Sequence, residues 1–359
     1  MRCDLIIVTY NQLEYTKGCI ASIEKNTPYP HRIIVVDNAS GEDTLAYLRA
    51  LEKEQRIVLI ANTVNEGWVK AVNRGIASSD AEYVCVMNND LICYPGWLDE
   101  MVRVAKMDPK IGLVNPEWEL PKRYPFGREI YIRTVIRAGA GKYIETDWAR
   151  GFCFLITRAL LRRIGGFDLE FSPGYYDDWD YSVRAIKSGF IVARAHGAFV
   201  WHFKNITYLS VGNKHELSTI LGQKGALFHD RWGYPLRVFF AGWRPWDRAV
   251  LTNVIRELLR DQHRVTVLGF RTGLRHSNLR EFRFFPGVRL FLSAFFALDN
   301  ARFNRRKRYD LIVCSAGVRK FLQLFPPLKE YNFFVPTAPD NSLALLKRAR
   351  NLKYAKKME

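Results

Sequence analysis

The sequence predicts an α/β protein whose main sheet is mostly parallel and covered by helices on both faces, followed by a smaller, basic α/β segment. Three observations support this fold. Short runs that are apolar on both faces alternate with stretches of helical periodicity, as in parallel sheets covered on both sides. Polar residues directly follow several of these runs, and positive charge is concentrated in the last third of the chain.

The predicted strands of the main sheet are followed by polar side chains. These strands lie at 5–8, 33–36, 57–60 and 83–87. Thr9 and Asn11 follow the first strand, Asp37 the second and Asp90 the fourth. A single Asp at such a place is more often a helix cap or turn residue. Because open α/β sheets bind ligands outside the carboxyl ends of their strands, we expect the four side chains to converge on one ligand.

Length and charge divide the chain in two. At 359 residues it exceeds the size of a typical single core, so we expect two domains, 1–239 and 240–359. Residues 1–239 hold 30 Lys and Arg against 27 Asp and Glu, whereas residues 240–359 hold 24 against 9. Such a basic segment attracts an anionic membrane surface, a phosphate-bearing lipid or glycan, or nucleic acid. A solvated basic surface without a partner is an equally weighted alternative.

Cysteine usage and hydropathy indicate the cellular compartment to be expected. The six cysteines form no Cys-x-x-Cys pair and mostly lie in apolar runs, which indicates reduced, buried thiols. The chain shows no signal-peptide pattern at its start and no window of 18 apolar residues. We therefore expect a cytoplasmic protein without a membrane span, with peripheral association at the inner membrane face through its basic segment.

Six motifs, taken in order, resemble those of glycosyltransferase family 2, most closely its rhamnosyltransferase-like branch. The motifs are Val8-Thr9-Tyr10-Asn11, Val36-Asp37-Asn38-Ala39-Ser40, Asn65-Glu66-Gly67 with Asn73-Arg74-Gly75, Met87-Asn88-Asn89-Asp90, Gly165-Gly166-Phe167-Asp168, and Tyr176-Asp177-Asp178-Trp179-Asp180 with His202. Each motif alone is weak, but their order and spacing over the first two thirds of the chain are specific.

This resemblance implies a GT-A fold with a donor half at about 1–115 and an acceptor half at about 116–239. It also implies a metal-dependent, inverting transferase. A hexosyl or deoxyhexosyl group would pass from a nucleotide diphosphate-sugar, UDP or dTDP being the expected nucleotides, to a hydroxyl of a glycan or lipid-linked acceptor in cell-surface polysaccharide synthesis.

The expected donor-binding residues come from the first four motifs. Asp37 would accept a hydrogen bond from the base or ribose, Gly67 would let the backbone approach the donor closely, and Lys70 would meet a phosphate. A solvated lysine is a nearly equal alternative for Lys70. The complete predicted donor set is Thr9, Tyr10, Asn11, Asp37, Asn65, Gly67, Lys70, Asn88 and Asn89.

A divalent cation would offset the charge that develops on the leaving diphosphate. The family uses a DxD-like element at the end of a buried strand, and here it is Asn88-Asn89-Asp90, with one carboxylate. The resemblance therefore assigns Asp90 and His202 to Mn²⁺ or Mg²⁺. A structural histidine and a turn of asparagines are the alternatives.

Three carboxylates within four residues, Asp177, Asp178 and Asp180, repel one another unless a metal, a basic partner or shifted pKa values offset the repulsion. By resemblance Asp178 is the catalytic base that deprotonates the acceptor hydroxyl. Asp177 would position the acceptor or the base, and Asp180 would cap the following helix. An acidic helix start that complements the helix dipole is the alternative.

Residues 148–156 are predicted to form a strand that enters the acceptor side. The resemblance makes Trp148, Arg150 and Trp179 acceptor contacts that stack on sugar faces, although aromatic residues are more often part of the core.

The last third repeats the α/β alternation. We expect a helix over 246–262 and strands at 264–268, 310–313 and 332–335. This pattern resembles the N-terminal half of a GT-B glycosyltransferase, so the segment would be an accessory or truncated Rossmann-like domain.

Rival functions were weighed. A sugar nucleotidyltransferase would need a glycine-rich, basic phosphate loop after the first strand, and residues 9–16 contain neither glycine nor a basic residue. A nucleic-acid-binding protein would explain the basic segment, yet no such module pattern is present, and we expect no nucleic acid. A non-catalytic glycan-binding protein stays open.

Overall fold

A computed structural model describes residues 2–120, 127–203, 214–241, 247–269, 271–282, 309–323, 331–336 and 341–356. The chain forms two compact units, Met1–Phe228 and His229–Glu359. In the described residues, no helix is long and apolar enough to cross a membrane. All six cysteines are buried and free.

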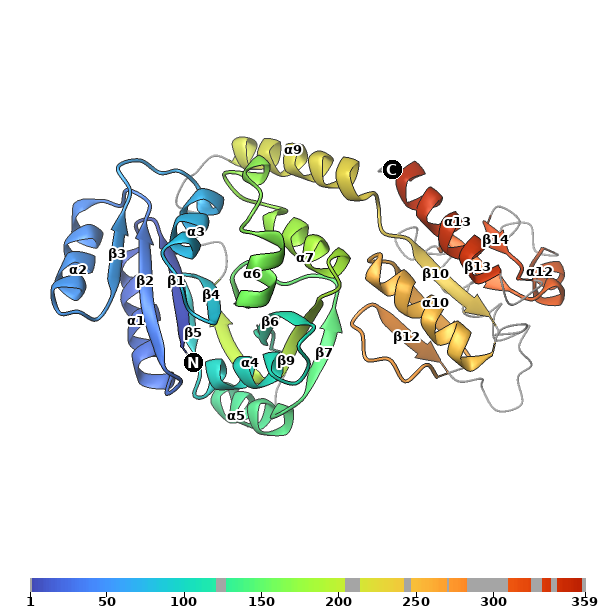
Figure 1. Cartoon of the computed structure of the whole chain (residues 1–359), viewed down its shortest axis with the longest axis horizontal. Helices are drawn as coiled ribbons and strands as arrows, with labels where there is room; N and C mark the ends of the chain where they lie inside the picture. Colours follow the sequence, from blue (N-terminus) through green and yellow to red (C-terminus); the bar gives the residue numbers. More distant parts are fainter. Residues whose placement is uncertain are drawn as a thin grey trace. The chain divides into compact units, whose positions relative to one another are not determined.

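The first unit is a mixed α/β domain built on one large sheet (Figure 1). Its strands are β1 (Cys3–Thr9), β2 (His31–Asp37), β3 (Val58–Ala61), β4 (Tyr83–Asn88), β5 (Leu91–Cys93), β6 (Ile111–Glu117), β7 (Tyr143–Thr146), β8 (Cys153–Thr157) and β9 (Ile191–His202). Its helices are α1 (Leu13–Asn26), α2 (Glu42–Lys53), α3 (Trp68–Ala77), α4 (Trp97–Ala105), α5 (Arg128–Gly139), α6 (Arg158–Ile164), α7 (Asp177–Lys187) and most of α9 (Lys214–Trp232).

The strand order is β3-β2-β1-β4-β8-β6-β9-β5, and β7 pairs with β9. Strands β1 to β4 run parallel, whereas β8 is antiparallel to both of its neighbours, β4 and β6. The carboxyl ends of β1, β2 and β4 therefore lie at the same edge of the sheet, where the polar residues that follow them were predicted to converge.

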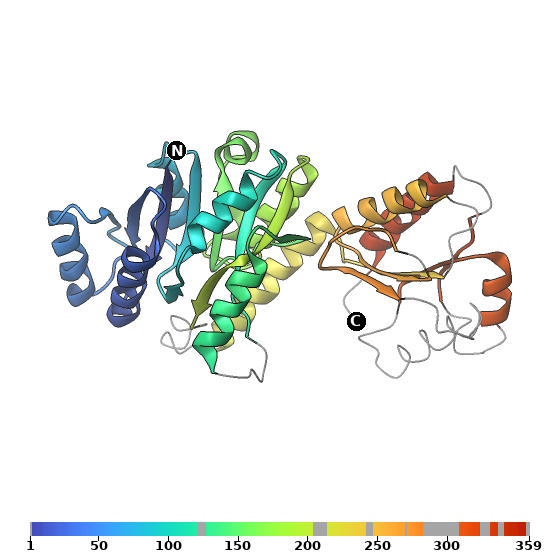
Figure 2. The same cartoon turned by 90° about the horizontal axis from the view of Figure 1, so that it is seen from below.

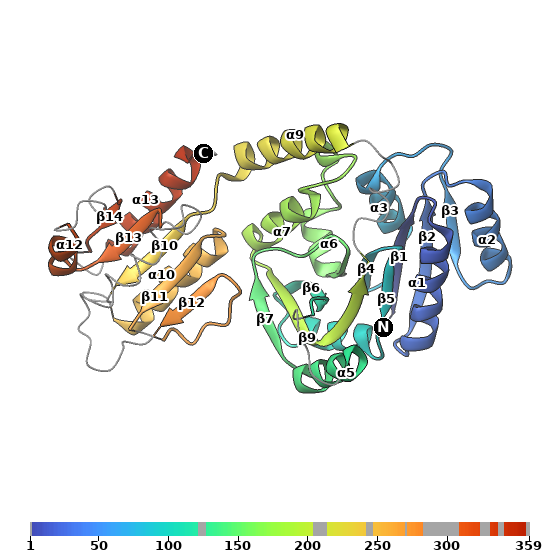
Figure 3. The same ribbon diagram turned by 180° about the vertical axis from the view of Figure 1, so that it is seen from behind.

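Helices cover both faces of this sheet, in agreement with the prediction. Residues of α1, α2 and α4 share one apolar core with alternate residues of β1 and β2, and Figure 3 shows α1 and α2 beside these strands. Helix α3 packs on the other face, where a Cβ added to Gly75 would lie 2.5 Å from Cγ2 of Ile6. This glycine allows the close helix-strand contact.

The second unit is built on a smaller sheet of five parallel strands in the order β12-β11-β10-β13-β14. Its strands are β10 (Arg237–Ala241), β11 (Arg264–Leu268), β12 (Leu279–Phe282), β13 (Leu311–Cys314) and β14 (Phe333–Phe334). Helices α10 (Arg248–Arg260) and α13 (Asn341–Ala355) cover one face (Figure 2), and α12 (Ala316–Leu322) packs on the other.

Two sequence predictions about local structure need correction. The boundary placed at 239/240 falls inside β10, which is the central strand of the second sheet, and the compact units instead divide after Phe228. The strand predicted over 148–156 begins only at Cys153. Before it, the N–H groups of Ala149 and Gly151 bond to side chains of α7 rather than to a neighbouring strand.

Candidate active site

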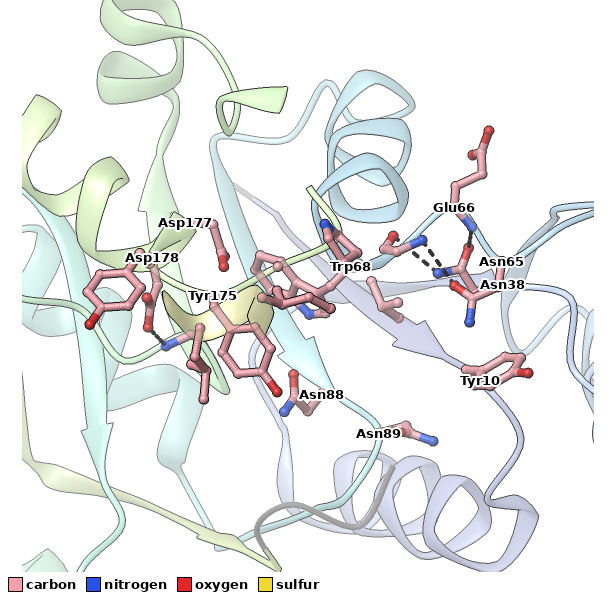
Figure 4. A pocket seen from close by; sticks show the side chains of 18 of the residues that line it. Tyr10, Asn38, Asn65, Glu66, Trp68, Asn88, Asn89, Tyr175, Asp177 and Asp178 are labelled. Atoms are coloured by element: carbon pink, nitrogen blue, oxygen red, sulfur yellow. Dashed lines mark hydrogen bonds between the residues drawn. The ribbon is translucent and has the colours of Figure 1, made fainter. Parts of the chain in front are cut away.

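A cavity of about 850 Å³ opens at the carboxyl edge of the first sheet. In the view of Figure 4, Asp177 and Asp178 lie on one side of it and Tyr10 and Asn89 on the other, with Asn88 between them. The predicted site residues among its lining are Tyr10, Asn65, Gly67, Asn88, Asn89, Asp90, Trp148, Asp177, Asp178, Trp179 and His202. Residues from four of the six motifs, together with Trp148, therefore meet at one cavity.

The end of β2 places Asn38, rather than Asp37, on the cavity wall. Asp37 is fully buried and its Oδ2 accepts a hydrogen bond from the Ser40 N–H at 3.1 Å, so that it holds the turn after the strand. The Oδ1 of Asp37 is buried and has no hydrogen-bond partner in the described residues.

The residues after β1 differ in their roles. Tyr10 lines the cavity, whereas Thr9 is fully buried beneath it. The backbone N–H of Asn11 donates to Oγ of Ser40, and its Oδ1 accepts from the Gly41 N–H at 2.8 Å. Asn11 thus ties the loop after β1 to the loop after β2 and does not itself line the cavity.

A network of amides shapes the loop that precedes α3. Asn38 donates to the Gly67 carbonyl and accepts from the Glu66 N–H (Figure 4). The chain then turns at Gly67, whose φ of 79° suits glycine, and a Cβ there would lie 2.6 Å from Cβ of Pro173. The close approach predicted for Gly67 is therefore to Pro173. Lys70 is exposed on α3 and is not among the lining residues.

The predicted metal ligands face each other. His202 Nε2 lies 3.3 Å from Asp90 Oδ1, and both atoms are buried without a hydrogen-bond partner in the described residues. The His202 ring stacks on Phe152, with ring centroids 4.8 Å apart. An imidazole nitrogen and a carboxylate oxygen are suitable ligands for Mn²⁺, so the pair fits such an ion.

Asp90 and His202 would supply only two protein ligands to an ion. The described residues contain no group of three or more His, Cys, Asp or Glu side chains that could hold a metal. An ion with two protein ligands keeps positions for substrate phosphates, which is how Mg²⁺ is usually held in phosphate-handling sites. Asn88 and Asn89 both line the cavity, and Nδ2 of Asn89 donates to Oγ1 of Thr16 at 2.9 Å.

Helix α7 starts with the acidic cluster and presents two of its carboxylates to the cavity. Oδ2 of Asp178 accepts from the Gly151 N–H at 2.7 Å, and Oδ1 accepts from the Trp179 N–H at 2.8 Å. Burial raises the pKa of Asp178, opposed by the Trp148 side chain and by these two N–H groups. Burial and the nearby charge of Asp178 raise the pKa of Asp177 well above its usual range.

Desolvation is the largest cause of the raised pKa at both carboxyls, and backbone N–H groups oppose the rise at both. The two carboxyls therefore titrate as a pair with raised pKa values. Neighbouring carboxyls with perturbed pKa values are typical of acid-base sites.

Asp180 does not cap the helix as predicted. Helix α7 begins at Asp177, and the capping position is occupied by Tyr176 in a left-handed conformation. Asp180 lies one turn inside the helix, fully buried, with its Oδ2 2.8 Å from Nε of Arg184. Its role is thus an internal ion pair of the helix.

The aromatic residues predicted to stack on sugars stack on one another instead. Trp148 stacks on Trp179 at 4.6 Å between centroids, and Trp179 in turn stacks on Tyr176 and Phe228. The guanidinium of Arg150 lies 3.8 Å from the centroid of the Trp148 ring. Trp148 and Trp179 line the cavity with their faces already covered in this way, which leaves their edges for a ligand.

Other lining residues were missed from sequence. Helix α9 contributes Glu216, Ile220 and Leu221, and no motif signals them because α9 has little amphipathic pattern. Trp68 and Glu66 lie next to predicted positions in the third motif, so proximity to that motif was the available signal.

Comparison with known proteins identifies the first unit. The model of the family described as glycosyl transferase family 2 matches residues 4–165. Residues 4–165 therefore form a glycosyl transferase family 2 domain. Among curated proteins, the chain is 26% identical over 236 residues to an N-acetylglucosaminyl-diphospho-decaprenol L-rhamnosyltransferase of Mycobacterium tuberculosis, covering 56% of the chain and 75% of the relative. It is 28% identical over 191 residues to an uncharacterized glycosyltransferase of Bacillus subtilis, covering 52% and 69%.

Solved structures give lower similarity to this chain. A mannosyltransferase from Pyrobaculum calidifontis in complex with GDP-Man and Mn²⁺ matches at 21% identity and a TM-score of 0.45, covering 56% of each chain. The Staphylococcus aureus TarS 1–349 structure in complex with UDP-GlcNAc matches at 14% identity and a TM-score of 0.44, covering 57% of this chain and 59% of that one.

Proposed function

We propose that this protein, with its family 2 glycosyltransferase domain, is an inverting, metal-dependent enzyme. It moves a sugar from a nucleotide diphosphate-sugar to a hydroxyl of a glycan or lipid-linked acceptor in cell-surface polysaccharide synthesis. The observation that carries the proposal is the meeting of the pair Asp90 and His202 with the pair Asp177 and Asp178 at one cavity. A relative whose name specifies rhamnosyl transfer to a diphospho-decaprenol acceptor supports the substrate class.

The donor binds along the edge formed by Tyr10, Asn38, Asn65 and Asn88. Asp90 and His202 hold Mn²⁺ or Mg²⁺, which when bound offsets negative charge on the diphosphate. Amide side chains at the strand ends supply hydrogen bonds for ribose and phosphate oxygens. UDP or dTDP is the expected nucleotide.

The chemical step depends on the α7 carboxyls. Asp178 accepts the proton of the acceptor hydroxyl while that oxygen attacks the anomeric carbon from the side opposite the diphosphate, which inverts the configuration. The N–H groups of Gly151 and Trp179 hold the Asp178 carboxylate in place. Asp177 lies next to the base at the cavity and positions the acceptor.

Purified protein tests this proposal with a panel of UDP-, dTDP- and GDP-sugars. We expect one donor to release nucleoside diphosphate, faster with Mn²⁺ or Mg²⁺ than with EDTA, and transfer to an acceptor to invert the anomeric configuration seen by NMR. A retained configuration would contradict the inverting mechanism. Formation of a sugar nucleotide and pyrophosphate from a sugar 1-phosphate and a nucleoside triphosphate would instead identify a nucleotidyltransferase.

The site of action belongs to the same proposal. We place the enzyme on the cytoplasmic side, with peripheral association at the inner membrane face through the basic residues of 240–359, where 24 Lys and Arg stand against 9 Asp and Glu. Flotation with vesicles containing anionic phospholipid tests this placement, with neutral vesicles as the control. Absence of binding to anionic vesicles at low salt would remove the membrane part of the proposal.

A further inference from the structure

Two consecutive tyrosines directly before α7 have a left-handed backbone. Tyr175 has a φ of 74° and Tyr176 a φ of 58°, and both residues line the cavity. Bulky side chains rarely adopt this conformation, because it brings their Cβ too close to the following carbonyl oxygen. Such backbone strain persists only where the surrounding structure imposes it, and it is most frequent at ligand-binding and active sites.

Tyr176 is fixed by contacts of its ring. Its ring centroid lies 5.6 Å from that of Trp179 and 5.4 Å from that of Phe228 in α9. A Cβ added to Gly225 of α9 would lie 3.2 Å from Oη of Tyr176, so the helix passes close to this ring. The Tyr176 carbonyl accepts the Asp180 N–H at 2.8 Å, which joins the residue to the first turn of α7.

The residues on the other side of Tyr175 are fixed by α3. The Pro173 carbonyl accepts the Trp68 N–H at 2.7 Å. A Cβ added to Gly174 would lie 3.8 Å from Cβ of Trp68 and 3.9 Å from Oδ1 of Asp177. Tyr175 therefore lies between two anchored neighbours, which impose its left-handed backbone from both sides.

These anchors direct the side chain of Tyr175 into the cavity. In the view of Figure 4, its ring lies between Asp178 on one side and Asn88 on the other. Under the proposed function, Asn88 belongs to the donor edge and Asp178 is the base. Since in-line transfer requires the anomeric carbon to stand between the leaving diphosphate and the attacking hydroxyl, a side chain in this interval is placed to contact the transferred sugar.

Resting on the proposed function, we propose that Tyr175 contacts the sugar of the nucleotide-sugar donor and orients it for attack by the acceptor hydroxyl. A tyrosine side chain combines an apolar ring with a polar hydroxyl, and this combination suits the surface of a sugar. The strained backbone is retained because it points this side chain at the sugar. Tyr175 is accordingly a determinant of which sugar is transferred, whereas the nucleotide is bound by residues at the strand ends.

The first test compares the binding of nucleotides with and without a sugar. Isothermal titration in the presence of Mn²⁺ pairs UDP-glucose with UDP, dTDP-rhamnose with dTDP, and GDP-mannose with GDP. Asparagine tolerates a left-handed backbone, so Tyr175→Asn removes the side chain without requiring a new backbone conformation. We expect this variant to bind the preferred nucleotide-sugar about tenfold more weakly, through loss of an aromatic contact, and the matching nucleoside diphosphate as the wild type does.

The matched control is Gln55→Asn. Gln55 also has a left-handed backbone, with a φ of 57°, but it is exposed after α2 and does not line the cavity. Both variants should unfold at a higher urea concentration than the wild type, because asparagine fits this conformation better. Only Tyr175→Asn should lose affinity for the nucleotide-sugar. A lower unfolding midpoint for Tyr175→Asn than for the wild type would show that the tyrosine is kept for stability, which would overturn the inference.

The same titrations distinguish failure of this inference from failure of the proposed function. If no nucleotide or nucleotide-sugar binds the wild type, the proposed function fails and the inference fails with it. If the wild type binds a nucleotide-sugar and Tyr175→Asn binds it equally well, only the inference fails. Tyr175→Phe, which keeps the ring, should bind the nucleotide-sugar more tightly than Tyr175→Asn does.

Discussion

The two units wind their sheets in the same way but differ in the polar groups described at the ends of their strands. In both, the first four strands lie in the order third, second, first, fourth, and all four run parallel. In the first unit, buried polar groups gather at the carboxyl ends, where Asp37 and Asp90 each leave one oxygen without a hydrogen bond.

In the described residues of the second unit, several polar groups at the amino ends of the strands bind one another. The Leu236 N–H donates to Nδ1 of His263, the Arg237 N–H donates to Asp310, and Lys353 donates to the Asp261 carbonyl. Directly after β11 and β13 stand Gly269 and Ser315, neither of which carries a carboxylate. A shared winding therefore does not by itself specify which side chains stand at the strand ends.

The largest effect should come from removing the base in the first unit. We expect Asp178→Asn to lower transfer by about 10²–10⁴-fold, since proton transfer by a positioned side chain contributes that much. The nucleotide-induced thermal shift should persist, because Asp178 lies away from the donor edge. Asp43→Asn, an exposed carboxylate of α2, is the matched control and should keep wild-type turnover. Equal turnover of both variants would remove Asp178 as the base.

The metal pair should give the next largest effect. His202→Gln and Asp90→Asn should each lower turnover by at least about tenfold, because charge stabilisation by a metal ion is worth several kcal/mol. They should also lose the part of the nucleotide thermal shift that depends on Mn²⁺. The control is His196→Gln, whose imidazole contacts Glu117 instead. Wild-type dependence on Mn²⁺ in His202→Gln would show that the ion binds elsewhere.

Acid should lower the stability of the second unit but not that of the first. Burial lowers the pKa of His263 to about 3, so the folded second unit resists a proton that the unfolded chain accepts below about pH 6.5. Stability is therefore full above that pH and is lost as the pH falls toward 3, by at most about 2 kcal/mol at pH 5. Hydrogen exchange, corrected for intrinsic rates, should show weaker protection of β10 and β11 at pH 5 than at pH 7, while β1 and β2 do not lose protection. An equal loss of protection in both sheets would contradict the expected difference between the two units.

The smallest effect concerns the stability of the first unit. The pKa of Asp177 is raised, so its contribution to stability is full below about pH 4 and is lost as the pH rises through the raised value. Asp177→Asn removes this loss, and we expect a gain of about 1 kcal/mol at pH 7 and none at pH 3 in urea unfolding. A gain of the same size at both pH values would show that the charge of Asp177 is not responsible.

Sequence patterns predicted most of this fold because the parallel strands of both units carry runs that are apolar on both faces. The strand expected at 264–268 is found as Arg264–Leu268, and the fourth strand of the first sheet ends at Asn88 as the motif requires. The failures share one cause. At 148–152, hydrogen bonds to side chains of α7 replace the predicted strand pairing. At Asp180, an ion pair with a residue one helical turn away replaces the predicted helix cap.

The candidate site shows the same limit. Motif order predicted that Asp90, His202 and Asp178 would meet, because each follows or precedes a regular element whose position the sheet determines. It did not predict that Asn38 would face the cavity instead of Asp37, since a shift of one residue at a strand end reverses the side-chain direction. Nor could it predict the α9 residues, which a segment outside the motifs brings to the cavity.

The contact between Gly67 and Pro173 has a mechanical consequence. The Trp68 N–H donates to the Pro173 carbonyl at 2.7 Å, so the segment leading into α3 is fastened to the segment leading into α7. Any adjustment that the nucleotide imposes on the first segment is passed to the start of the helix that bears Asp178. Under the proposed function, this joint would couple donor loading to alignment of the acceptor.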